Sequence, residues 1–283
     1  MGKRISLMAA LVILMVGGVL ADRIETVDET FQFEDAESVQ VECDFAAGQL
    51  WITAADMDEL AKIEVTYEPR YVDYKFDYRV KHGVGRLMLE SDLKRTHHND
   101  NLENEWMVKL SRKLPMELLV DVGACEADID LGGIPLTEAE FDIGAASGRI
   151  EFSEPNPRRM EKLSFDVGAS SVDLVRLGNA NFDYMDFDGG AGACEMDFRG
   201  EYHGESVVNI DIGAGSADIV VPKGLPVQIE ADKDGWFSSV DFGNLDLEKV
   251  GRNLWETPDF EGARDRLVLR VDVAMGSVDI YAR

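Results

Sequence analysis

The stretch Phe165-Asp-Val-Gly-Ala-Ser-Ser-Val-Asp-Leu174 decides the fold, because its pattern recurs along most of the chain. Two short segments that alternate apolar and polar residues flank a run of small residues. Alternation with a period of two indicates a half-buried strand, and glycine supplies the backbone angles of a tight turn. Each unit therefore predicts a strand, a turn and a second strand.

The copies of this unit recur at a regular spacing. Their leading aspartates are Asp44, Asp121, Asp142, Asp166, Asp188, Asp211 and Asp272, of which the first begins the loosest copy. Four successive gaps are 21, 24, 22 and 23 residues. Repeats of this length are typical of solenoids, in which each coil stacks on its neighbour. We therefore predict an all-β fold, a β-solenoid of the single-stranded β-helix type with coils of 21–24 residues.

The chain divides into three predicted parts. Residues 1–21 form a leader, residues 22–120 form an N-terminal β section with the first coil and an insertion, and residues 121–283 form the repeat section. The insertion contains strand-like segments at 63–67, 71–80, 86–90 and 106–110. Solenoids need caps at their open ends. We expect the N-terminal section to cap one end, and an irregular loop at 245–264 to shield the other.

The leader has the features of a secretory signal. Lys3 and Arg4 precede an apolar run from residue 5 to residue 21, and Asp22 follows. We expect cleavage after Ala21. The alternative is an uncleaved membrane anchor, since the run is at the short limit of the roughly 20 residues that a spanning helix needs. Both interpretations place the remaining chain outside the cytoplasm, in the periplasm or at the cell surface.

Composition excludes several functions. The chain has 283 residues, with 28 Lys and Arg against 55 Asp and Glu, a formal charge of −27. This charge argues against nucleic acid or an anionic lipid surface as partner, because both require clustered cations. No glycine loop of a nucleotide site and no Gly-x-Ser-x-Gly elbow is present, so neither a cofactor nor a catalytic residue is predicted.

The three cysteines form no metal-binding or disulfide pattern. Cys43, Cys125 and Cys194 are odd in number and widely spaced. Cys125 and Cys194 lie three coils apart, a separation of ~14 Å at the spacing of strands. A disulfide needs Cα atoms within ~7 Å, so we predict that these two are not bonded to each other.

Several connectors follow one another in an order that is similar to a known group of proteins. They are Leu114-Pro-Met-Glu-Leu-Leu-Val-Asp-Val-Gly-Ala124, Leu177-Gly-Asn-Ala-Asn-Phe182, Ile219-Val-Val-Pro-Lys-Gly-Leu-Pro-Val227 and Met275-Gly-Ser-Val-Asp-Ile280. Over roughly residues 28–283 the chain resembles the bacterial toast-rack adhesin-like families, which include the C-terminal domain of LiaF-like envelope-stress proteins. The resemblance implies a β-solenoid outside the cytoplasm, and it implies no particular reaction.

The repeated aspartates are the main candidate for a site. Asp121, Asp142, Asp166, Asp188 and Asp211 would form a ladder of like charges ~4.8 Å apart. Such neighbours repel, and a cation would relieve them, so one hypothesis is calcium binding. The other is that outward aspartates keep an extended surface soluble. We favour the second, because calcium needs ~6–8 oxygens that converge on one point.

Histidines and aromatic residues provide weaker candidates. His97 and His98 are adjacent, so in a strand they point to opposite faces, and a solvated loop is the favoured interpretation. The aromatic residues of the insertion and the loops would fill caps or stack on sugars, and packing is favoured; they are Trp51, Trp106, Trp236, Trp255, Tyr67, Tyr71, Tyr74 and Tyr78. Tyr74, Phe76 and Tyr78 share one face, which is either buried or a binding surface.

The prediction for function is a non-catalytic, exported, adhesin-like scaffold or interaction module of the bacterial cell envelope. Its partner would be an envelope protein or a surface polymer, and the resemblance adds a link to the envelope-stress response. The membrane would be contacted only through an uncleaved leader. Two alternatives remain: an enzyme that acts on polysaccharide through a pair of carboxylates, and a cation-binding sensor.

Overall fold

The fold is built almost entirely from β-strands. The computed structural model describes residues 24–94, 102–231 and 237–283. These residues form 17 strands and one short 3-10 helix, η1 (Leu177–Ala180), and no α-helix. No helix in the described ranges is long and apolar enough to span a membrane. The all-β prediction is confirmed, whereas the predicted leader at 1–21 lies outside the described residues.

The strands differ in length, from 2 to 18 residues. In chain order they are β1 (Glu25–Phe31), β2 (Ser38–Ala55), β3 (Ala61–Tyr67), β4 (Val72–Lys81), β5 (Val84–Leu93), β6 (Asn104–Ser111), β7 (Met116–Asp130), β8 (Leu136–Ile143), β9 (Ser147–Glu151), β10 (Met160–Val175), β11 (Phe182–Asp197), β12 (Glu205–Val221), β13 (Val227–Ala231), β14 (Ser238–Asp241), β15 (Glu248–Lys249), β16 (Leu254–Glu256) and β17 (Arg266–Ala282). The predicted strands of the insertion correspond to β3, β4, β5 and β6.

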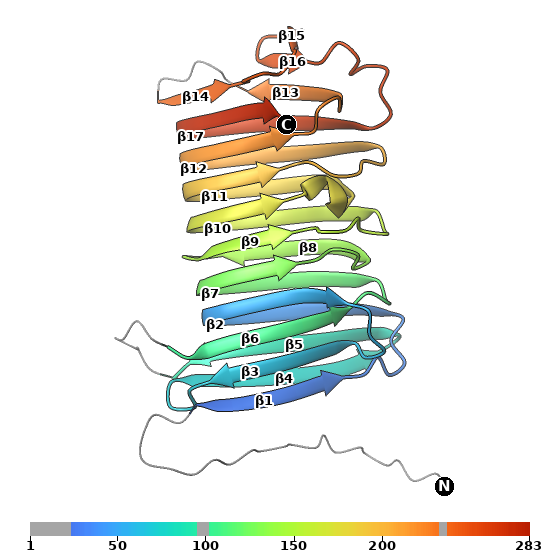
Figure 1. Cartoon of the computed structure of the whole chain (residues 1–283), viewed down its shortest axis with the longest axis vertical. Coiled ribbons are helices and arrows are strands. Elements are labelled where there is room, and N and C mark those ends of the chain that lie inside the picture. Colours follow the sequence, from blue (N-terminus) through green and yellow to red (C-terminus); the bar gives the residue numbers. More distant parts are fainter. Residues whose placement is uncertain (1–23, 95–101, 232–236) are drawn as a thin grey trace.

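The seven copies of the repeat stack as parallel layers, which we call rungs. Strand β2 pairs with β7, β7 with β8 and β9, and these with β10. Strands β10, β11, β12 and β17 continue the stack in that order. Figure 1 shows the rungs lying one above another along the long axis of the molecule.

Six of the seven rungs differ from the predicted strand, turn and strand, because each is one continuous strand. Strand β10 runs without interruption through its small residues, and Ala169 pairs with Ala191 in the middle of the bend. The small residues therefore bend the strand without ending it, because their backbone groups still bond to the neighbouring rungs. Only the copy that begins at Asp142 is interrupted, between β8 and β9. We call the parts before and after the bend the first half and the second half of a rung.

The core lies between the two halves of the rungs. In β10 the residues Phe165 and Val167 of the first half and Val172 and Leu174 of the second half are buried, and all belong to one continuous hydrophobic cluster. The ring of Phe165 stacks on that of Phe141 in the preceding rung, with centroids 5.0 Å apart. The alternation of apolar and polar residues thus determines which side chains fill the core. The register of the strands then stacks similar side chains on one another in successive rungs.

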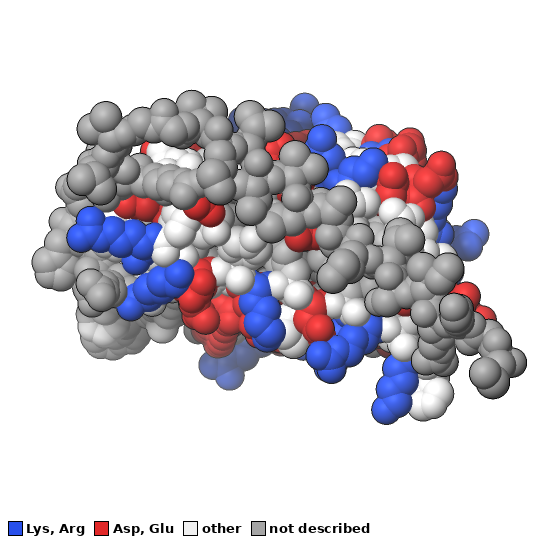
Figure 2. All heavy atoms as spheres, turned by 90° about the horizontal axis from the view of Figure 1, so that it is seen from below, with Lys and Arg blue, Asp and Glu red and all other residues white. Residues whose placement is uncertain are grey.

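The insertion closes the N-terminal end of the stack. Strands β5 and β6 pair in parallel with the first and second half of β2, and in antiparallel fashion with β4 and β3. Strand β1 then covers β3. Blue and red side chains are interspersed over the described part of this end in Figure 2, in contrast to the acidic repeat section.

The C-terminal end departs from the order of the sequence. Strand β17 pairs with β12 on one edge and with β13 and β14 on the other. In the sequence, the segment that contains β13 and β14 lies between the Asp211 and Asp272 copies. In the structure it lies beyond the Asp272 copy, at the end of the stack. Strand β17, with 17 residues, can pair along both edges, whereas β13 and β14 are short. The predicted shielding loop carries β15 and β16, and β16 pairs with β13 at this end.

Candidate binding groove

The leading aspartates of all seven copies are register partners. Asp44 pairs with Asp121, and the series continues without a slip through Asp142, Asp166, Asp188, Asp211 and Asp272. All seven are exposed on the outer face of the first halves. The register fixes the ladder that the spacing predicts, with neighbours ~4.8 Å apart.

The role of calcium in this ladder stays a prediction. In the described ranges no group of three or more histidine, cysteine, aspartate or glutamate side chains is arranged to hold a metal ion. A thermal-shift measurement with millimolar calcium tests the hypothesis, which is wrong if calcium leaves Tm unchanged.

Like charges at the N-terminal end of the ladder affect Asp44. Partial burial raises the pKa of this carboxyl, and the neighbouring carboxylates of Asp121, Asp92, Glu90 and Glu42 raise it further. Because the folded-state pKa lies above the unfolded value, ionised Asp44 destabilises the folded protein. The free energy of unfolding therefore rises as the pH falls through the interval between the two pKa values.

We expect Asp44→Asn to raise Tm at pH 7 by about 1–2 °C, a small effect because the exposed side chain is screened by water. The gain should vanish as the pH falls below about 4, where the carboxyl takes up a proton in both states. Asp259→Asn in an exposed loop controls for the loss of one negative charge. A gain that persists at acid pH would show that the repulsion is not its cause.

A groove of about 790 Å³ follows the outer face of the first halves across β8, β10, β11, β12 and β17. It ends against Ala231 of β13 and Asn253. Its carboxylates are Glu140, Asp142, Asp166, Asp186, Asp188, Asp211, Glu230 and Asp272. Only two cations, Lys162 and Arg270, are among its lining residues. We call this feature the acidic groove; it combines the aspartate ladder with a second column of side chains.

A chain of polar contacts runs along that second column, which contains Asp186, Asn209, Arg270 and Glu230, and Lys162 joins it from the adjoining outward column. Lys162 Nζ lies 3.6 Å from Asp186 Oδ2, and Asn209 Nδ2 donates to Asp186 Oδ1 at 2.8 Å. Arg270 donates to Asn209 Oδ1 at 3.4 Å and lies 3.8 Å from Glu230 Oε2. The five side chains come from five different strands, so they link the rungs while presenting donors and acceptors to the groove.

A second hollow of about 480 Å³ lies on the same face, beside the acidic groove. Tyr184 of β11 lines it with 57% of its surface exposed. The other lining residues are Arg159, Asp183, His203, Gly204, Glu205 and Val207. We call this hollow the tyrosine pocket. Tyr184 and Asp186 are two residues apart on one strand, so both point outward and connect the two hollows.

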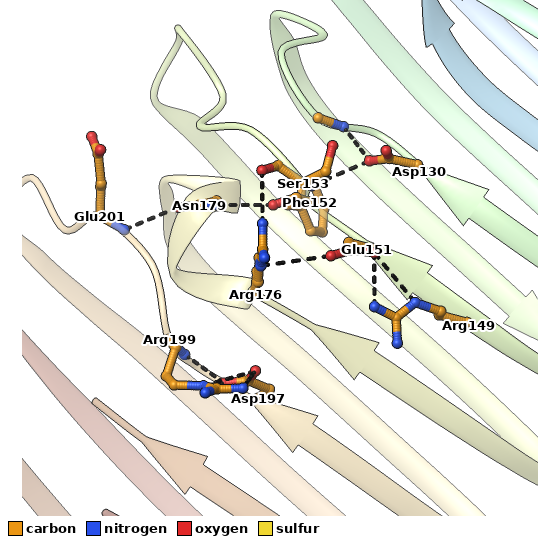
Figure 3. Close-up of polar contacts among 11 residues, drawn as sticks. Asp130, Arg149, Glu151, Phe152, Ser153, Arg176, Asn179, Asp197, Arg199 and Glu201 are labelled. Atoms are coloured by element: carbon orange, nitrogen blue, oxygen red, sulfur yellow. Dashed lines mark hydrogen bonds and ion pairs between the residues drawn. The ribbon is translucent and has the colours of Figure 1, made fainter. Parts of the chain in front are cut away.

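The connectors between rungs lie at the edge away from the bend, where buried amide side chains and arginines hold neighbouring connectors together (Figure 3). Asn179 Nδ2 donates to the carbonyl of Phe152 at 2.9 Å, and the backbone N–H of Glu201 donates to Asn179 Oδ1 at 3.1 Å. Arg199 and Asp197 form a pair with its closest atoms 2.6 Å apart. One asparagine thus bridges the connectors on either side of its own and holds them together.

We expect Asn179→Leu to lower the free energy of unfolding by about 2–3 kcal/mol, since it leaves the buried carbonyl of Phe152 and the part-buried N–H of Glu201 without partners. Urea unfolding measures the change. Asn244→Leu is the matched control, because Asn244 makes the same two kinds of contact with Ala282 at an exposed site. Water can replace these contacts, so the control should cost less than about 1 kcal/mol. Equal costs would contradict a buried bridge at Asn179.

The aromatic candidates divide between packing and positions that stay untested. Trp106 is fully buried, and Tyr74, Phe76 and Tyr78 pack against the core, which confirms the packing interpretation for that face. Trp236, His97 and His98 lie outside the described residues. The tyrosine pocket is not among the sites that the sequence predicts, although one signal exists: Tyr184 occupies an outward position on a predicted strand.

The cysteines are free thiols. Cys125 and Cys194 are not bonded to each other, which confirms the prediction. Burial raises the pKa of Cys43 to about 12, that of Cys125 to about 11 and that of Cys194 to about 12. Thiols of this kind are protonated at neutral pH and are poor nucleophiles.

Comparisons with known proteins identify one family model and several solved structures. The model described as "N-terminal domain of toast_rack, DUF2154" matches residues 21–162, which are 142 of the 283 residues. No curated protein matches the chain.

Solved structures of bacterial proteins are also similar to the chain. A "putative cell adhesion protein" from Clostridium sporogenes has 20% identity and a TM-score of 0.49, with 92% of this chain and 100% of that chain covered. A "putative adhesin" from Bacteroides fragilis has 9% identity and a TM-score of 0.38, with 93% and 98% covered. A "putative adhesin" from Parabacteroides distasonis has 12% identity and a TM-score of 0.29, with 91% and 97% covered.

Proposed function

This chain belongs to the family of toast-rack N-terminal domains, and from that premise we propose that it is a non-catalytic β-solenoid that serves as an adhesin-like binding scaffold of the bacterial cell envelope. Each rung with its connector would be one coil. The scaffold would be exported to the periplasm or the cell surface, as the leader pattern at residues 1–21 suggests. Its partner would be an extended envelope polymer or protein that lies along the acidic groove.

The observation that carries this proposal is the shape and repetition of the acidic groove. It crosses five rungs and is open to solvent, so it suits a long partner better than a small substrate. A partner that follows the stack would meet an equivalent outward aspartate at every rung, about 4.8 Å from the last. Many weak contacts of one kind would then add up along its length.

The same repetition supports a binding role over catalysis. Acid–base cleavage of a glycosidic bond needs two carboxylates with different roles, set apart by their environments. The leading aspartates of the groove repeat one exposed environment from rung to rung; they are Asp142, Asp166, Asp188, Asp211 and Asp272. The competing function, a polysaccharide-acting enzyme, predicts that incubation with cell envelopes releases soluble saccharide fragments, and a scaffold predicts that none appear.

Co-sedimentation of residues 22–283 with washed bacterial cell envelopes tests the proposal. We expect the protein to pellet with the envelopes, and Asp186→Lys with Asp211→Lys to abolish this. The matched control is Asp173→Lys with Asp218→Lys, because these exposed aspartates lie on the second halves of the rungs, outside the groove. Failure to pellet, or equal loss in both double variants, would contradict a scaffold that binds through the groove.

A further inference from the structure

The tyrosine pocket departs from the repeat in a way that packing does not require. In the outward column of Tyr184, Lys162 lies on one side, and the next two residues on the other side, Val207 and Val268, pack with Phe260 in a small apolar cluster. Phe260 does not extend over Tyr184, which lies beside this cluster with 57% of its surface exposed. A large aromatic side chain beside a hollow, rather than under the cover, offers a flat apolar face to a ligand.

The polar groups around this ring are held in place. Arg159 lies 2.8 Å from Asp183 Oδ1 and 3.2 Å from Asn181 Oδ1, and it also donates to the carbonyl of Glu205. Glu205 Oε2 in turn accepts from Arg266 at 2.6 Å. Each carboxylate is thus oriented through one oxygen by an arginine.

Each of these two carboxylates is held through one oxygen, which leaves the other as an acceptor for a ligand, and both Asp183 and Glu205 line the hollow. His203 borders the same space with a side chain that is 63% exposed. The space beside Gly204 is also open, since an added Cβ there would meet no atom within 4 Å. The hollow therefore offers hydrogen-bond acceptors and an imidazole around an aromatic face, with room for a ring-sized ligand.

From this arrangement we infer that the tyrosine pocket is a saccharide subsite, and that the polymer bound along the acidic groove is a neutral or amino-bearing glycan. The C–H face of a sugar ring packs on an aromatic ring, and its hydroxyls donate to carboxylate oxygens. This inference rests on the proposed function and names the class of its partner.

The charge of the acidic groove decides between glycan classes. Eight carboxylates against two cations repel a uronic-acid or phosphate-bearing polymer, and they accept hydrogen bonds from hydroxyl or ammonium groups. Each rung beyond the tyrosine pocket presents a further outward carboxylate ~4.8 Å from the previous one. A glycan chain that follows the stack would therefore meet hydrogen-bond acceptors along its length.

A glycan microarray with neutral, amino-bearing and uronic-acid oligosaccharides tests this inference on residues 22–283. We expect binding to neutral or amino-bearing glycans only. We expect Tyr184→Ala to reduce it at least about tenfold and Tyr184→Trp to retain it, because a stacking face is a large part of such affinity. Phe237→Ala is the control, since Phe237 is an aromatic residue 73% exposed at the bend edge, away from the pocket.

Three outcomes would overturn the inference: no glycan bound, a preference for uronic-acid glycans, or equal binding by the protein and Tyr184→Ala. The sedimentation assay separates this failure from that of the scaffold. If envelopes still pellet the protein and Tyr184→Ala pellets equally well, the groove binds a non-glycan partner and the saccharide subsite is wrong. If envelopes do not pellet the protein at all, the proposed function itself fails.

Discussion

Gly192→Ala is expected to destabilise the protein by about 3–5 kcal/mol in urea unfolding, or to prevent folding. Gly192 lies in the bend of β11 with φ +146°, a backbone conformation that residues with a Cβ rarely adopt. A Cβ at this position would come to 1.9 Å from the backbone oxygen of Ser170 in the preceding rung. Relief of that clash requires two rungs to separate, which breaks the ladder between them.

Substitutions at two other glycines distinguish the cost of backbone strain from the cost of the clash between rungs. Gly224 has φ +79°, and a methyl group added there would meet no atom within 4 Å, so Gly224→Ala should cost only the backbone strain of about 1 kcal/mol. Gly262 has neither a positive φ nor a close neighbour, and Gly262→Ala should be neutral. Should all three substitutions cost the same, close approach of the rungs at the bend would not be what requires Gly192.

Trp106→Ala is expected to lower the free energy of unfolding by about 3–5 kcal/mol. Trp106 is fully buried where the N-terminal strands meet the stack, with Phe45 at 5.4 Å and Phe76 at 5.2 Å between ring centroids. Its indole N–H donates to Asn104 Oδ1 at 3.0 Å. Removal of the ring leaves a cavity and a buried acceptor without its donor, and both effects destabilise.

Trp51→Ala is the matched control for Trp106→Ala. Trp51 lies on β2, which pairs with the strand of Trp106, but its side chain is only half-buried. Its replacement should cost about 1 kcal/mol, because much of the ring already contacts water. Comparable losses at the two tryptophans would show that the N-terminal strands do not share a packed core with the stack.

The seven aspartates show why the rungs were predictable from sequence. A rung of nearly constant length brings Asp142, Asp166, Asp188 and Asp211 to the same register position, so their spacing alone specifies the ladder. Alternation around Phe165 likewise specifies which residues are buried. Both features depend on local pattern, which a single sequence contains.

The ends and the site depend on contacts that local pattern does not contain. Nothing near Val227 or Val240 indicates that β17 inserts between these residues and β12, since that order is decided by how a distant strand pairs. The acidic groove was not predictable because outward aspartates alternate in the same way on a flat or a hollowed sheet. Tyr184 is exposed because Phe260, a residue distant in sequence, packs on Val207 and Val268 of the same column and not on Tyr184.

Distances between spin labels along the aspartate column test the central claim, that the copies stack in register as successive rungs. Labels on cysteines introduced at Asp121 and Asp188 are three rungs apart, and labels at Asp121 and Asp211 are four rungs apart. A stack in register predicts separations of ~14 Å and ~19 Å. Labels at Asp44 and Asp272, six rungs apart, should be separated by ~29 Å. A series that does not lengthen by ~5 Å per rung, or an Asp44–Asp272 distance shorter than the Asp121–Asp211 distance, would contradict it.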